Sequence, residues 1–201
     1  MANIFIVSGS HRENSQSGRM ARYIEGKLEG LGASGDILDL GRTPLPLWRE
    51  DFWDDPRPEW AVWEPIAKRL QEADGLVVIA PEWHGMAPAA LKNFFLLTTR
   101  NEVADKPGLL VGVSGGPGGT YPIAELRMSS TKNNRLCYIP DQMIIRNVGQ
   151  VFLDPDNMSD EDRYFDARLE HDLRLLLAYS EALATVRAAN LRNWTDFGNG
   201  M

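Results

Sequence analysis

The chain has 201 residues, of which 43% are hydrophobic and 24% are charged, as is typical of a folded globular protein. Its formal net charge of −7 argues against nucleic-acid binding, because phosphate contacts need a basic surface. A single cysteine, Cys137, excludes an internal disulfide, and the histidines are too far apart in sequence to predict a metal site. We expect one domain over residues 1–201, located in the cytoplasm, with no membrane span and no signal peptide.

Short apolar runs alternate with helical stretches along the whole chain. Strands are expected at 3–7, 36–40, 75–80, 109–113 and 143–145, the last continuing toward Val148 and Val151. Helices are expected around 20–31, 59–73, 88–98 and 122–136, and from Ser159 with Asp162 as its capping partner. This alternation predicts a doubly wound α/β sheet, whose ligand lies beyond the carboxyl ends of its strands.

Two segments interrupt the alternation. Residues 41–65 contain five prolines and the tryptophans Trp48, Trp53, Trp60 and Trp63. The tryptophans either pack this long connection onto the sheet or form a contact between subunits. The tail from Trp194 to Met201 carries little signal, and we expect it to be mobile.

The first of three candidate ligand loops follows the strand at 3–7 and leads into a helix. Ser10, Ser15 and Ser17 supply hydroxyl groups there, and Arg12 supplies a guanidinium. A helix N-terminus with such donors suits a phosphate, although serine also caps helices without any ligand. The loop has neither the Walker A pattern nor Gly-x-Gly-x-x-Gly. Phosphate binding is therefore a hypothesis that the other loops must support.

Two further loops follow the strands at 75–80 and 109–113. The second contains Pro81, Glu82, Trp83, His84 and Gly85, and it can offer backbone N–H groups to the edge of a flat ligand. The third contains Ser114, Gly115, Gly116, Gly118 and Gly119, whose small size leaves room for a ligand against the main chain. Either loop alone could be ordinary packing or a flexible turn. Three such loops at one edge of one sheet favour a cofactor pocket.

Three motifs and their spacing resemble the NADPH-dependent FMN reductase family of flavodoxin-like proteins, which includes flavin, quinone, chromate and azo-dye reductases. The motifs are Gly9-Ser10-x-Arg12-x-x-Ser15, Pro81-Glu82-Trp83-His84-Gly85 and Leu91-Lys92-Asn93, and Arg100 and Leu126-Arg127 extend the match. The family pattern usually reads Pro-Glu-Tyr-Asn-x-Ser, where this chain has Trp83, His84 and Met86. Ser17 stands where asparagine is common. The resemblance covers residues 3 to 150.

The resemblance implies a flavodoxin-like, three-layer α/β/α fold with strand order 2-1-3-4-5 and an FMN cofactor. It implies that the FMN phosphate is held by Ser10, Arg12, Ser15 and Ser17, together with N–H groups near Gln16. It also implies that residues 81–85 line the isoalloxazine ring and that residues 114–119 close the other side of the ring. The implied activity is hydride transfer from NADPH or NADH, through the flavin, to a quinone, a flavin or a similar small acceptor. Relatives of this kind form homodimers or homotetramers. No catalytic side chain is expected, because the flavin carries the chemistry.

Two other functions remain open from the sequence. A flavodoxin-type electron carrier or flavin-binding sensor would have the same fold, but NADPH would reduce it only slowly. An esterase is suggested by Gly112-Val113-Ser114-Gly115-Gly116, which matches Gly-x-Ser-x-Gly, with Asp154 and His171 following in hydrolase order. Prolines and glycines delay the next helix, however, and His171 falls inside an expected helix. The esterase is therefore the weaker alternative.

Overall fold

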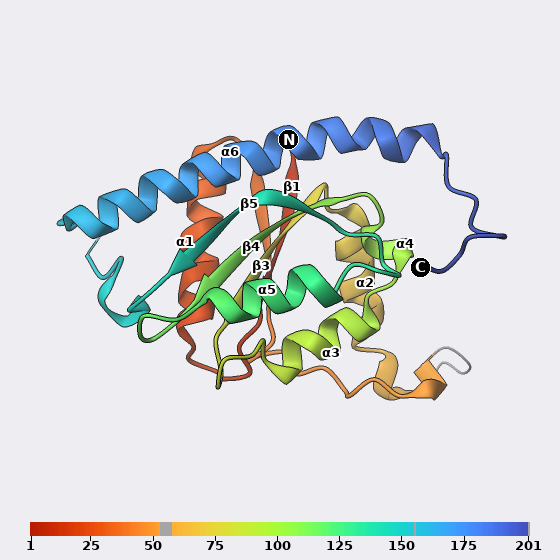
Figure 1. The fold of residues 1–201 in the computed structure, drawn as a ribbon, viewed down its shortest axis with the longest axis horizontal. Helices are drawn as coiled ribbons and strands as arrows, with labels where there is room; N and C mark the ends of the chain where they lie inside the picture. Colours follow the sequence, from red (N-terminus) through yellow and green to blue (C-terminus); the bar gives the residue numbers. More distant parts are fainter. Residues whose placement is uncertain (53–57, 155, 201) are drawn as a thin grey trace.

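The computed structural model describes residues 1–52, 58–154 and 156–200. Five parallel strands form one sheet in the order β2-β1-β3-β4-β5 (Figure 1). The strands are β1 (Asn3–Ser8), β2 (Ser34–Asp39), β3 (Gly75–Pro81), β4 (Pro107–Val113) and β5 (Cys137–Ile145). The helices are α1 (Gln16–Gly30), α2 (Trp63–Glu72), α3 (Ala89–Leu97), α4 (Arg100–Val103), α5 (Thr120–Ser129) and α6 (Asp160–Ala189), with 3-10 turns η1 (Glu50–Phe52), η2 (Pro58–Trp60) and η3 (Val148–Gln150). This strand order confirms the predicted flavodoxin-like, doubly wound fold.

Helices cover both faces of the sheet and bury its central strands. Every residue of β3 and β4 is buried, as expected where helices lie on both sides of a parallel strand. Side chains of α1 and α6 pack against one face, and those of α2, α3 and α5 pack against the other. In Figure 1, α6 accordingly runs along one side of the sheet and α3 and α5 along the opposite side. No helix in the described ranges is long and apolar enough to cross a membrane.

Strand β5 is much longer than the expected strand at 143–145. Polar residues and Pro140 interrupt the apolar pattern of β5, so its first half was not predicted. These residues lie at a bulge in the strand. Gly108 pairs with Tyr138 but Leu110 pairs with Gln142, so extra residues of β5 stand opposite one residue of β4. The Arg127 guanidinium stabilises the bulge by donating to the carbonyl oxygens of residues 139, 140 and 141.

Two predicted helices were too long. The helix expected at 122–136 is α5, which ends at Ser129, after which the chain turns and enters β5. The helix expected at 59–73 is α2, which begins at Trp63 after the turn η2. The predicted start of the last helix is confirmed, since Ser159 and Asp162 form a reciprocal capping box.

The tryptophan-rich connection packs onto the sheet. Trp60 and Trp63 are 7% and 6% exposed and belong to the core on the α2 side, which supports packing rather than a subunit contact for these two. Trp53 lies outside the described residues. The buried Asn93 of α3 holds the connection, because its side chain donates to the Pro46 carbonyl at 2.9 Å and accepts from the Trp48 N–H at 2.7 Å.

Asn93→Ala should lower the free energy of unfolding by about 1–3 kcal/mol, because it removes the two part-buried hydrogen bonds that the Asn93 side chain makes with the Pro46 carbonyl and the Trp48 N–H. Urea denaturation followed by tryptophan fluorescence measures this change. Asn101→Ala is the matched control, since the Asn101 side chain is exposed and should change stability by less than about 0.5 kcal/mol. Equal effects of the two substitutions would contradict this role of Asn93.

The C-terminal tail, whose mobility stays a prediction, contacts the body of the protein at several points. The guanidinium of Arg100 lies 4.9 Å from the centre of the Trp194 ring, and that of Arg192 lies 5.5 Å from it. Gly200 donates its N–H to the Asn133 side chain at 3.2 Å. The tail therefore lies beside α4 and the turn that follows α5.

Candidate functional site

The three predicted loops leave neighbouring strands at the same edge of the sheet. Strand β1 pairs with β3, and β3 pairs with β4, so the loops after these strands lie side by side. Gly9, at the end of β1, donates its N–H to the Ile79 carbonyl at 2.9 Å. A Cβ at this position would lie 2.6 Å from that oxygen, so only glycine lets the first loop start so close to β3.

The start of α1 presents polar groups that have no partner within the described chain. Ser15 caps the helix by accepting the Gly18 N–H at 2.9 Å, while the N–H groups of Gln16 and Ser17 meet no acceptor. The Ser17 hydroxyl is 1% exposed and makes no hydrogen bond. The Arg12 side chain is exposed and forms no ion pair with any described carboxylate. These donors fit an anion such as a phosphate.

Ser10 lies on the same loop and is 2% exposed. Its hydroxyl accepts the Arg12 N–H at 3.3 Å and so shapes the turn that carries the guanidinium. A cavity of about 200 Å³ borders the outer side of this helix start, between Glu13, Arg22 and Arg42. Of the residues predicted to bind phosphate, Ser15 and Gln16 line this cavity, whereas Ser10, Arg12 and Ser17 lie on the same loop and first turn of α1 but do not line it.

The loop after β3 forms a tight two-residue turn. Trp83 and Met86 exchange two backbone hydrogen bonds, of 3.0 and 2.9 Å. His84 and Gly85 between them have φ values of 49° and 72°, and such a turn needs positive φ at both positions. Their N–H groups make no hydrogen bond to the described chain, whereas those of Glu82 and Trp83 are already paired. The donors left for a flat ligand are therefore His84 and Gly85.

Side-chain contacts hold the three loops together, and these contacts were not predicted from the sequence. The rings of His11 and Trp83 lie 4.8 Å apart, which joins the first loop to the second. The Glu82 carboxylate accepts the Gly119 N–H, which joins the second loop to the third. A Cβ on Gly118 would lie 2.7 Å from that carboxylate. Glu82 therefore positions the loops, since both its carboxylate and its N–H are already hydrogen-bonded within the protein.

The loop after β4 is anchored at both ends and open in the middle. Ser114 donates its N–H to the Ile145 carbonyl at 3.0 Å, and its hydroxyl accepts the Gly116 N–H at 3.2 Å. Gly119 has a φ of 102°, and a Cβ there would lie 2.7 Å from the Ile144 side chain. Gly115 and Gly116 face open space, which leaves room for a ligand.

The alternative hydrolase residues are not assembled in the described structure. No hydrogen bond between described residues joins Ser114, Asp154 and His171. His171 lies instead beside Asp141 and Asp172. Each of the three side chains offers one potential metal-ligating atom, and these atoms all lie within 4.8 Å of one another. Sequence spacing could not show this cluster, because it joins β5 to α6. The Arg168 guanidinium already forms ion pairs with both carboxylates, at 2.9 Å to Asp141 and 3.1 Å to Asp172, so they do not need a metal ion to balance their charge.

The strand order defines a flavodoxin-like fold, and the three loops lie at one edge of its sheet. Residues 2–150 match the sequence model described as NADPH-dependent FMN reductase. The chain belongs to this family.

Three known proteins illustrate the similarity. An NADPH azoreductase of Bacillus sp. (strain OY1-2) is 27% identical over 142 residues, which cover 71% of this chain and 75% of that protein. A 2-hydroxy-1,4-benzoquinone reductase of Burkholderia sp. is 32% identical over 121 residues, covering 58% of this chain and 63% of that protein. The solved structure of the flavoenzyme NAD(P)H:(acceptor) oxidoreductase FerB from Paracoccus denitrificans aligns with a TM-score of 0.69 at 20% identity, covering 92% of this chain and 98% of that one. This last likeness supports the fold.

Proposed function

We propose that the protein is an NAD(P)H-dependent oxidoreductase that uses FMN to pass a hydride to a quinone, a flavin or a similar small acceptor. The observation that carries this proposal is at the start of α1: among the described residues, the Gln16 and Ser17 N–H groups and the buried Ser17 hydroxyl have no hydrogen-bond partner, and the Arg12 guanidinium, on the loop before the helix, has no ion-pair partner. A phosphate would supply the acceptors that all three lack. Family membership identifies FMN as the group that carries this phosphate.

Each loop has a distinct part in this proposal. The phosphate would be held by Ser10, Arg12, Ser15, Gln16 and Ser17. The ring system would lie against Pro81, Glu82, Trp83, His84 and Gly85 on one side and against Ser114, Gly115, Gly116, Gly118 and Gly119 on the other. When bound, FMN supplies the chemistry by accepting a hydride from NAD(P)H and passing electrons on to the acceptor. The side chains hold, orient and shield the ring, so no side chain is assigned a catalytic role.

The acceptor class is proposed from the relatives and from the open third loop. The names of the relatives point to azo compounds and benzoquinones, which are flat molecules. Gly115 and Gly116 leave space beside the site in which a flat molecule can lie. We also propose that the protein acts in the cytoplasm as a homodimer or homotetramer.

The proposed function is tested by steady-state oxidation of NADPH by the FMN-saturated protein. A benzoquinone, an azo dye and free FMN are compared as acceptors. Turnover with at least one acceptor, lost when FMN is removed and restored when it is returned, is the expected result. If the protein binds FMN but oxidises NADPH no faster than free FMN in solution does, it would instead be an electron carrier or a sensor.

His84→Ala should leave reduction of the bound flavin by NADPH within about fivefold of the unchanged protein, because a flavin needs no acid–base side chain for hydride transfer. Alanine keeps the Cβ that His84 carries at a φ of 49° and is only slightly less favourable at positive φ than histidine, so the turn should persist. Anaerobic stopped-flow absorption measures this rate. A protein that still binds FMN but no longer accepts a hydride would show that His84 has a catalytic role.

A further inference from the structure

Arg19, near the start of α1, holds a segment that is distant in the sequence but adjacent in the fold. Its guanidinium donates to the carbonyl oxygens of Val148, Val151 and Phe152, at 2.5, 2.9 and 3.1 Å. These residues belong to the connection between β5 and α6, which lies beside α1 in Figure 1. All three acceptors are main-chain oxygens, so the Arg19 side chain fixes the path of this connection.

The same connection supports the third loop, which follows β4. Asn147 donates its N–H to the Gly116 carbonyl at 3.2 Å. Val148 donates its N–H to the Ser114 carbonyl at 3.0 Å. Val148 therefore takes part in both sets of contacts, because its carbonyl oxygen accepts from Arg19. A single residue separates the Arg19 guanidinium from the loop that is proposed to close over the flavin ring.

The connection depends on such contacts, because two of its residues have an unfavourable backbone conformation. Asn147 and Phe152 have φ values of 46° and 54°, which a bulky residue such as phenylalanine rarely adopts. Phe152 is also held by its N–H, which donates to the Asp162 carboxylate at 2.6 Å, and by its ring, whose centre lies 4.1 Å from that of Tyr23. Conformations of this kind persist only where the surrounding structure holds them. Loss of the Arg19 contacts should therefore let residues 146–152 relax.

Arg19 also contacts the proposed phosphate site. Its Nε donates to the Gln16 side chain at 2.7 Å. The Gln16 N–H is one of the two donors at this helix start that meet no acceptor among the described residues. The Arg19 side chain can contact both regions because a planar guanidinium carries several N–H donors in a fixed arrangement, whereas lysine has a single ammonium.

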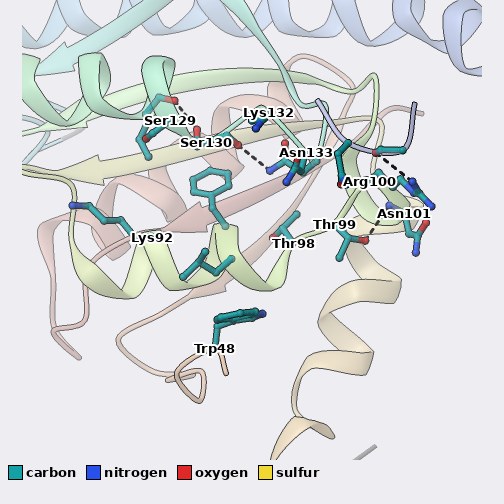
Figure 2. Close-up of a pocket in the computed structure, with 16 residues that line it drawn as sticks. Trp48, Lys92, Thr98, Thr99, Arg100, Asn101, Ser129, Ser130, Lys132 and Asn133 are labelled. Carbon is teal, nitrogen blue, oxygen red and sulfur yellow. Dashed lines mark hydrogen bonds between the residues drawn. The ribbon is translucent and has the colours of Figure 1, made fainter. Parts of the chain in front are cut away.

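The contacts of Arg19 lie on the face of the sheet that α1 and α6 cover. The cavity of about 900 Å³ drawn in Figure 2 lies on the opposite face, between α3 and α5. Neither Arg19 nor any of its partners lines that cavity. A substitution of Arg19 should therefore act on the flavin loops without disturbing the surface between α3 and α5.

We propose that Arg19 is a positioning residue that fixes the third loop against the flavin ring. The proposal rests on the proposed FMN function. Arg19 acts through the carbonyl oxygens of residues 148–152 and through the N–H groups of Asn147 and Val148, without touching the flavin. Binding of the ring thereby depends on a side chain of the helix that begins at the phosphate.

The test compares FMN with riboflavin, which has the same ring and no phosphate, by fluorescence titration of the flavin-free protein. Arg19→Gln should weaken riboflavin binding by about twofold to thirtyfold, the range for residues that modulate a site without contacting its ligand. It should weaken FMN binding at least as much. Arg19→Lys should have a smaller effect, because its ammonium can still donate to a carbonyl oxygen.

Two other arginines provide the comparison. Arg22→Gln removes an exposed guanidinium from α1 that makes no hydrogen bond or ion pair with the described residues, and it should leave the binding of both flavins unchanged. Arg12→Gln should weaken FMN binding alone, because Arg12 is proposed to hold the phosphate. Visible circular dichroism of the FMN-saturated protein is the second readout, since it reports on the surroundings of the ring. It should change in the Arg19 variants only.

Loss of stability alone would not produce this pattern in variants that remain folded, which near-ultraviolet circular dichroism checks. Arg19→Lys carries the comparison if Arg19→Gln does not fold. Riboflavin affinity and flavin dichroism that are the same in the Arg19 variants as in Arg22→Gln would overturn the proposal. So would weaker binding of FMN with normal binding of riboflavin, because Arg19 would then serve the phosphate alone. If the original protein bound neither flavin, the proposed FMN function itself would be wrong.

Discussion

Gly9→Ala should lower the free energy of unfolding by about 2–3 kcal/mol, at the upper end of typical overpacking costs. The added Cβ would lie 2.6 Å from the Ile79 carbonyl oxygen and 2.8 Å from the Leu91 side chain. A backbone oxygen inside a sheet cannot move aside as the tip of a side chain can. The end of β1 would therefore separate from β3, and FMN affinity should fall together with stability.

Gly26→Ala is the matched control for this prediction. Gly26 lies inside α1, and no atom lies within 4 Å of a Cβ built there. This substitution should raise the free energy of unfolding by about 0.5–1 kcal/mol, because alanine is a better helix former than glycine. Chemical denaturation of both variants measures the contrast. If both variants had the same stability, the close approach of β1 to β3 would be refuted.

Ser17→Ala should weaken FMN binding by roughly tenfold to a hundredfold, the loss expected for one hydrogen bond to a charged group. The same substitution should raise the stability of the FMN-free protein by up to about 1 kcal/mol, because it removes a buried hydroxyl that has no hydrogen-bond partner among the described residues. A buried group that hydrogen-bonds only to the ligand produces these opposite changes, because its removal weakens ligand binding and stabilises the ligand-free protein. They are measured by fluorescence titration with FMN and by denaturation without it.

Ser15→Ala provides the comparison on the same loop. The Ser15 hydroxyl already accepts the Gly18 N–H at 2.9 Å, so its removal should cost about 1 kcal/mol of stability in the FMN-free protein. If Ser17→Ala destabilised the FMN-free protein as Ser15→Ala does, the Ser17 hydroxyl would have a structural role. The assignment of the phosphate site would then lose its main support.

The sequence was enough to predict the sheet and the loops that leave it, because local patterns encode both. Uninterrupted apolar runs predicted β3 and β4, which are buried at every position. The Ser159 and Asp162 pair predicted the start of α6 because a capping box depends on residues three apart. The residues predicted to bind phosphate lie on the loop before α1 and in its first turn, and their contact with a phosphate stays a prediction.

Features that depend on distant contacts were missed. The bulge in β5 is supported by Arg127 from α5, and no local pattern records that support. The Glu82 carboxylate accepts a hydrogen bond from Gly119, 37 residues further along the chain, and no local pattern predicts this contact. The tail has no periodic pattern, and the rings and guanidinium groups that hold it in place come from separate elements. Such contacts become visible only once the fold brings their partners together.

The FMN-dependent reductase function is tested most directly by an absorption spectrum of the protein after loading with FMN and desalting, recorded again after NADPH is added without oxygen. We expect flavin bands at one FMN per chain, which bleach when NADPH is added. Bands that persist unbleached would contradict the reductase function while leaving the FMN site intact. Loss of the flavin on desalting, with no binding in a subsequent titration, would contradict the assignment of the three loops.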